Sequence, residues 1–158
     1  MIRNHRPIRR LGIPGGVRLL GIALGLLCVV SWSHASQDVG YVVIVHTENP
    51  TETLSKGKVS QFLLKKSFRW AHDDRVEPID LTGDSPVRAS LTEDIHGRSV
   101  NSVKAYWQRQ IFSGRAVPPP ELPDDSAAVE FVASHPGAIG YVSSSTPLQG
   151  VKAITLTD

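Results

Sequence analysis

The chain has 158 residues, a formal net charge of +2 and one Cys, and its length suits a single domain. Five of its 17 Lys and Arg residues lie within positions 1–18, so residues 36–158 carry 12 basic against 15 acidic side chains, a net charge near −3. This acidic balance, without a run of basic and aromatic residues, excludes nucleic acid as the expected partner. The only cysteine is Cys28, so a disulfide-stabilised scaffold is excluded as well.

Residues 1–35 have the pattern of a cleaved secretory signal. An arginine-rich start is followed by 14 uncharged residues, 19–32, and by Ser33-His34-Ala35 with small residues at the positions required for cleavage. An uncleaved membrane anchor is the alternative, but 14 residues fall short of the roughly 20 that a spanning helix needs. We therefore predict a mature domain of residues 36–158 in the periplasm, without a stable membrane anchor.

The first half of this domain alternates strand and helix patterns. Residues 39–46 are nearly all apolar and β-branched, as in a strand buried on both faces. Ser55 can cap a helix to about Lys66 with apolar residues three and four positions apart. After a loop with Phe68 and Trp70, residues 75–80 form a short strand in which Pro78 favours an edge position.

Three helices and two strands are expected in the remainder. A helix over residues 86–96 ends at Gly97, and the next starts at Ser99 or Asn101 and ends near Gly114. It places Val103, Trp107 and Ile111 on one face, and Tyr106-Trp107 is expected at the core and its rim. Residues 115–123, with three successive prolines, form an extended connector.

The last helix starts at Asp124 or Asp125 and ends at His135, because Pro136 follows. Residues 136–142 are then a tight turn into a short strand, and a final strand is expected at residues 151–156. Gly140 inside the first of these suggests close approach of another backbone or of a ligand. Strands alternating with helices predict a single wound α/β domain of three layers, with its site at the carboxyl ends of strands.

The turn between residues 80 and 88 is the candidate binding site. Ser85 is a favourable N-cap and Pro86 fits the first helical position, so the N–H of Val87 should point outward. Arg88 is a cation at a helix N-terminus, which the helix dipole disfavours, so it needs compensation by Asp84 or by a bound anion. An ordinary capped helix is the alternative interpretation.

The sequence offers little support for catalysis or for metal binding. The histidines after residue 35 are not spaced as zinc ligands. Ser85 lies in no Gly-x-Ser-x-Gly turn, and Pro86 lacks the N–H that would serve as an oxyanion donor. We therefore predict neither an enzyme nor a bound cofactor.

Several motifs together resemble the periplasmic phosphate-binding protein of phosphate ABC transporters, in the type 2 periplasmic-binding superfamily. They cover about residues 41–145 and include residues 54–66 with Trp70, the strand and turn over residues 76–88, Tyr106-Trp107 with residues 111–114, and the most specific one, residues 136–142. The resemblance implies two α/β lobes that close on phosphate. Carried over by position, one side of that cleft would be formed by Gly83, Asp84, Ser85, Val87 and Arg88.

The chain departs from this family at two points. The family turn is Gly-Ser-Gly-Thr-like, whereas this chain has Gly83-Asp84-Ser85-Pro86, which removes one N–H and adds a carboxylate. Only the predicted signal precedes residues 39–46, where the family has a first lobe. The resemblance thus implies a single lobe that binds phosphate or a related oxyanion, with an ABC permease or another envelope protein as partner. The open alternatives are a dimer that rebuilds the cleft and an envelope interaction or sensor module without tight ligand binding.

Overall fold

A computed structural model describes residues 39–158 of the chain. They belong to one compact unit, which contains both hydrophobic clusters of the described residues. Since the unit carries its own core, residues 36–158 are expected to fold alone. The predicted signal, residues 1–35, lies outside the described residues and stays a prediction.

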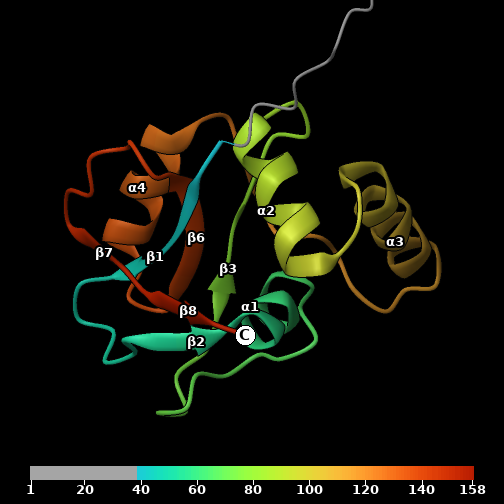
Figure 1. Ribbon diagram of the computed structural model, residues 1–158. Coiled ribbons are helices and arrows are strands. Elements are labelled where there is room, and N and C mark those ends of the chain that lie inside the picture. Colours follow the sequence, from blue (N-terminus) through green and yellow to red (C-terminus); the bar gives the residue numbers. More distant parts are fainter. Residues whose placement is uncertain (1–38) are drawn as a thin grey trace, which may run out of the picture. The chain divides into compact units, whose positions relative to one another are not determined.

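A four-stranded mixed sheet forms the centre of the domain, with strand order β3-β6-β1-β7. Strand β1 (Tyr41–His46) pairs antiparallel with β6 (Ala138–Ser143) and with β7 (Val151–Ala153). The edge strand β3 (Glu77–Pro78) runs parallel to β6, so Pro78 lies in an edge strand as expected. Figure 1 shows α4 (Asp125–Ser134) on one side of this sheet, with α1 (Lys56–Leu63) and α2 (Pro86–His96) on the other. The three-layer α/β prediction is confirmed.

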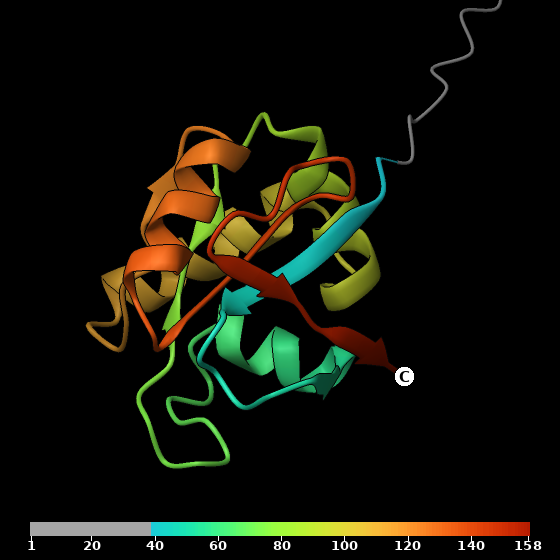
Figure 2. The same cartoon turned by 90° about the vertical axis from the view of Figure 1, so that its left-hand side faces the viewer.

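Two smaller sheets of short parallel strands complete the fold. Strand β2 (Thr53–Ser55) pairs with β8 (Thr155–Thr157), and β4 (Asp80–Leu81) pairs with β5 (Glu121–Leu122). In Figure 2 the C-terminal segment passes from β7 beside β1 to β8 beside β2. The single strand predicted at 151–156 is therefore two strands in different sheets.

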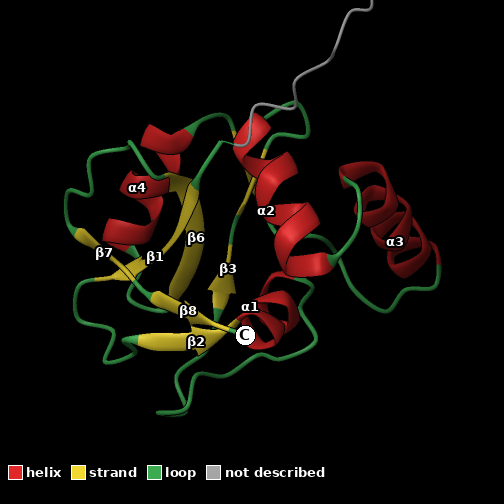
Figure 3. Ribbon diagram, in the orientation of Figure 1, coloured by secondary structure: helices red, strands yellow, loops and turns green. Residues whose placement is uncertain are grey.

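Helix ends follow the capping residues of the sequence. Side chains of Ser55, Ser85 and Asp124 accept a hydrogen bond from the third backbone N–H of α1, α2 and α4, and Ser99 caps α3 (Val100–Phe112) in the same way. Helix α2 ends at Gly97, whose φ of 59° is the left-handed conformation that glycine tolerates. In Figure 3, α1, α2 and α4 lie beside the strands, and α3 lies further out, beyond α2.

The main core is formed by β1, β6 and the apolar faces of α1, α2 and α4. Gly140 approaches the Ile79 side chain, because a Cβ at position 140 would lie 2.6 Å from Ile79 Cδ1. The close neighbour of Gly140 is thus a core side chain, and not the backbone or ligand that the sequence suggested. A second, smaller cluster joins Leu64 to Val103 and Trp107 of α3. Trp107 is buried with Tyr106 at its margin, as predicted, but Ile111 is 50% exposed and lies outside the core.

No helix within residues 39–158 is long and apolar enough to cross a membrane.

Candidate functional site

Two helices begin at the same end of the domain because the strands before them are parallel neighbours. Strand β4 leads through the turn at Gly83 into α2, and β5 leads through Pro123 into α4. The carboxyl ends of parallel strands meet at one edge, so the N-termini of α2 and α4 also meet. They border an open hollow of about 450 Å³, which is lined by Thr82, Asp84, Ser85, Pro86, Val87, Pro123, Asp124, Asp125 and Ser126.

Several polar donors are available in this hollow. The Ser85 side chain caps the N–H of Arg88 at 3.2 Å, and the Asp124 side chain caps the N–H of Ala127 at 2.9 Å. The remaining early N–H groups, those of Val87 in α2 and of Asp125 and Ser126 in α4, have no partner from the helix or its cap. Such groups at helix N-termini favour an anionic ligand.

Three carboxylates also line the hollow, and each is used by a protein donor. Asp124 caps α4, and Asp125 Oδ2 accepts hydrogen bonds from the Ser143 N–H at 2.9 Å and from Thr146 Oγ1 at 2.6 Å. The pKa of Asp84 is lowered, chiefly by a hydrogen bond with the Thr82 side chain. The carboxylates reduce the net attraction for a dianion, because like charges repel at short range.

Arg88 does not line the hollow. Its side chain is 2% exposed, and its Nη2 lies 2.7 Å from Asp80 Oδ2. Its Nη1 donates to Glu121 Oε1 at 2.7 Å and to the Leu81 carbonyl at 2.6 Å. The prediction that a nearby group compensates this cation is thus correct, but the groups are Asp80 and Glu121 rather than Asp84. The guanidinium fastens the β4–β5 pair to α2.

Asp80 is the centre of the same buried network. Burial raises the pKa of this carboxyl, while the charge of Arg88 and a hydrogen bond from the Tyr141 hydroxyl oppose the rise. Burial beside Asp80 also raises the pKa of Tyr141. The Tyr141 hydroxyl therefore helps to hold the Asp80 carboxyl beside Arg88.

Gly83 lies at the turn itself, beside a lysine that the sequence did not indicate. A Cβ at position 83 would overlap the ammonium group of Lys104, which comes from α3. Lys104 also contributes to the lowered pKa of Asp84. Of the five predicted site residues, Asp84, Ser85 and Val87 line the hollow, Gly83 borders Lys104, and Arg88 is buried beneath.

Sequence reasoning missed Ser126 and Lys104 as residues near the site. Asp124 and Asp125 were recognised as helix caps, but the pairing of β4 with β5 that brings them beside Ser85 involves only two residues in each strand. Such short strands have no periodic pattern, so no local signal indicated the pairing.

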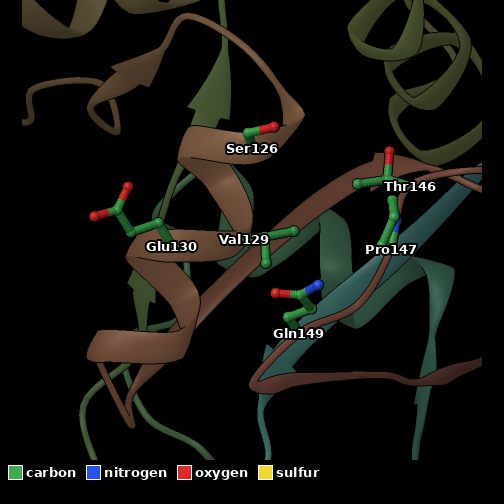
Figure 4. Close-up of a pocket in the computed structure, with 6 residues that line it drawn as sticks. All are labelled: Ser126, Val129, Glu130, Thr146, Pro147 and Gln149. Atoms are coloured by element: carbon green, nitrogen blue, oxygen red, sulfur yellow. The ribbon is translucent and has the colours of Figure 1, made fainter.

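A second hollow of about 350 Å³ lies beside α4, between the helix and the loop after β6. Figure 4 shows Val129 and Gln149 facing each other across it, with Glu130 and Ser126 on α4 and Thr146 and Pro147 on the loop. The lining is mixed and its only formal charge is that of Glu130, so it offers no anion site.

Another polar contact in the described part of the chain involves a histidine. Ser60 Oγ lies 2.8 Å from His96 Nδ1 and links α1 to α2, and burial lowers the pKa of His96 to about 4. Within residues 39–158, no group of three or more His, Cys, Asp and Glu side chains is placed to hold a metal ion.

Comparison with solved structures finds the same fold within several longer proteins. A Clostridium perfringens protein with bound phosphate, assigned as a phosphate ABC transporter substrate-binding protein, aligns with a TM-score of 0.60 at 19% identity over 74% of this chain and 44% of its own. A Vibrio cholerae ABC-type phosphate transport receptor aligns with a TM-score of 0.59 at 17% identity, over 74% of this chain and 46% of its own. PstS from Borrelia burgdorferi aligns with a TM-score of 0.53 at 14% identity, over 75% of this chain and 47% of its own.

These likenesses establish the fold. The chain spans less than half the length of these proteins, which agrees with a single lobe of their architecture. No protein-family model matches the chain, and no curated protein matches it by sequence.

Proposed function

We propose that this chain is a periplasmic, substrate-binding-protein-like lobe that binds phosphate or a related oxyanion in the hollow between α2 and α4. The observation that carries the proposal is the convergence of two helix N-termini at the carboxyl ends of β4 and β5. This arrangement occurs in a fold whose solved relatives include one with bound phosphate. The role is binding rather than catalysis.

In this proposal the donors are backbone and hydroxyl groups rather than the arginine. The N–H groups of Val87, Asp125 and Ser126 and the hydroxyls of Ser85 and Ser126 face the anion. Asp84 accepts a hydrogen bond from a protonated phosphate oxygen, and Gly83 lets the Lys104 ammonium approach the turn. Arg88 acts as a positioning residue, because its ion pairs hold β4, β5 and α2 together.

The expected affinity is modest. One open lobe cannot enclose the anion, and three carboxylates lie around it, so a dissociation constant of roughly 0.1–10 mM is expected. Export through residues 1–35 and cooperation with an ABC permease complete the proposal. Tighter binding would require a partner that covers the hollow.

Titration calorimetry of residues 36–158 with phosphate tests the site. A Ser126→Glu variant adds a carboxylate to the hollow and should weaken binding about tenfold or more, since like charges repel at short range. Gln61→Glu adds the same charge at an exposed position of α1, near the C-terminal end of α2. This variant should bind phosphate like the unchanged chain. Equal affinity in all three proteins would reject the hollow as the site.

An envelope interaction module without a tight ligand is the second candidate. The observations that favour it are the Arg88 guanidinium, whose two terminal nitrogens contact protein acceptors, and Pro86, which offers no N–H at the first helical position. This candidate predicts no heat with phosphate or sulfate from a chain that circular dichroism shows to be folded. It also predicts a specific envelope partner, recoverable by crosslinking.

A further inference from the structure

Basic residues are concentrated in two segments that contain no Asp or Glu. Residues 53–72 and 95–120 hold nine of the 12 Lys and Arg residues found after position 35. The nine are Lys56, Lys58, Lys65, Lys66, Arg69, Arg98, Lys104, Arg109 and Arg115. The acidic residues are therefore confined to the rest of the domain, including the hollow between α2 and α4.

The fold brings the two basic segments together. Leu64, just after α1, packs against Val103 and Trp107 of α3, and the Tyr106 hydroxyl donates to the Leu64 carbonyl at 3.4 Å. Lys65 Nζ lies 3.3 Å from the Pro118 carbonyl and so borders the segment that follows α3. The fold thus brings cations of both segments close to each other, and two of them are paired, Lys56 with Asp94 and Arg69 with Asp73.

Exposed apolar side chains gather at the end of α3. Phe112 is 89% exposed, Val117 64% and Ile111 50%, and all three lie within seven residues. Single exposed apolar residues are common, but three of the largest in one short segment mark an interaction surface. We call residues 109–117 the α3 tip. Figure 1 shows α3 at the margin of the domain, beyond α2.

The cations of the α3 tip have no acidic partner within residues 39–158. The ion pairs of this part of the chain use Lys56, Arg69, His72, Arg88 and Lys152, and none uses Arg109 or Arg115. Lys66 Nζ lies 5.9 Å from the Tyr106 ring centroid and adds a further positive charge. Exposed aromatic and aliphatic groups thus lie between unpaired cations.

We propose that the α3 tip docks onto an anionic phospholipid surface. Phe112, Ile111 and Val117 would enter the interface between head groups and acyl chains, while Arg109 and Arg115 contact lipid phosphates. Charge complementarity favours this occupant, because residues 109–117 contain two cations and no acidic residue, and neither cation has an ion pair with a described carboxylate. The contact is peripheral and independent of the anion site between α2 and α4.

Co-sedimentation of residues 36–158 with vesicles tests the proposal. Vesicles of phosphatidylcholine with phosphatidylglycerol are compared with vesicles of phosphatidylcholine alone, at low salt. Binding is expected only to the anionic vesicles. Phe112→Ser should reduce partitioning about tenfold, and Arg115→Glu about five- to tenfold.

Two matched variants serve as controls. Leu148→Ser removes a partly exposed apolar side chain from the loop after β6, and Lys152→Glu reverses a cation on β7; both should bind like the unchanged chain. No binding of the folded domain to anionic vesicles would overturn the proposal, as would binding that both α3-tip variants retain. Self-association in solution that Phe112→Ser abolishes, without any lipid binding, would instead assign the surface to a second copy of this chain.

Discussion

Replacing Arg88 with alanine tests whether this side chain supports the fold rather than the ligand. The side chain is 2% exposed, and the side chain of its partner Asp80 is 16% exposed. Removing one member of a buried ion pair costs about 3–5 kcal/mol, because the remaining charge stays away from water. A domain is stable by about 5–15 kcal/mol, so Arg88→Ala should lose a large part of that stability.

Urea denaturation of residues 36–158, followed by circular dichroism, measures this loss. The loss should be smaller near about pH 4.5 than near about pH 8. Burial already raises the pKa of Asp80, and without the opposing charge of Arg88 that pKa rises further. The folded variant then keeps a proton that the unfolded chain releases, so its stability falls as the pH rises through the pKa of Asp80.

Arg109→Ala is the control for this experiment, because Arg109 is an exposed cation on α3 without an ion pair to a described carboxylate. Its effect on the free energy of unfolding should stay within about 0.5 kcal/mol. A loss below about 1 kcal/mol for Arg88→Ala would refute the structural role of the ion pairs. Because Arg88→Ala disturbs the fold, it cannot report on anion binding by itself.

Further substitutions test the packing, the caps and the pH dependence. Gly140→Ala should destabilise the domain by about 1–3 kcal/mol in urea denaturation, because the new Cβ would lie 2.6 Å from Ile79 Cδ1. An unchanged free energy of unfolding would mean that the core repacks freely. Ser85→Ala should cost about 0.5–2 kcal/mol by removing the cap of the Arg88 N–H, and Ser85→Asp should restore most of it. His96 should make the stability of the domain fall by about 1–2 kcal/mol as the pH drops from 6.5 to about 4, because burial lowers its pKa and the unfolded chain takes up the proton first. His96→Gln should remove this pH dependence of stability. A pH profile that stays unchanged in the variant would exclude His96 as the source of the dependence.

The helices could be predicted from the sequence because their signals are local. Ser85, Pro86 and Gly97 define both ends of α2, and Asp124 with His135 defines α4. Each of these residues acts on backbone groups within a few positions of itself. The same holds for the buried strand β1, whose β-branched run is continuous.

The partners of Arg88 could not be predicted, because they depend on contacts between distant segments. Glu121 lies 33 residues further along the chain and reaches Arg88 only through the pairing of β4 with β5. Ile111 continues the apolar spacing of α3 but is exposed, since the small cluster around Leu64 and Trp107 does not extend to it. Periodicity thus indicated the face of the helix but not how much of that face is covered.

Amide NMR of isotope-labelled residues 36–158 during a phosphate titration tests the central claim most directly. Binding in the hollow predicts saturable shifts of the Val87, Asp125 and Ser126 amides, with a dissociation constant of roughly 0.1–10 mM. The amide of Gln61 on α1 should stay unchanged. A folded domain in which phosphate moves none of the three amides, or moves that of Gln61 equally, would contradict the account and favour an interaction module.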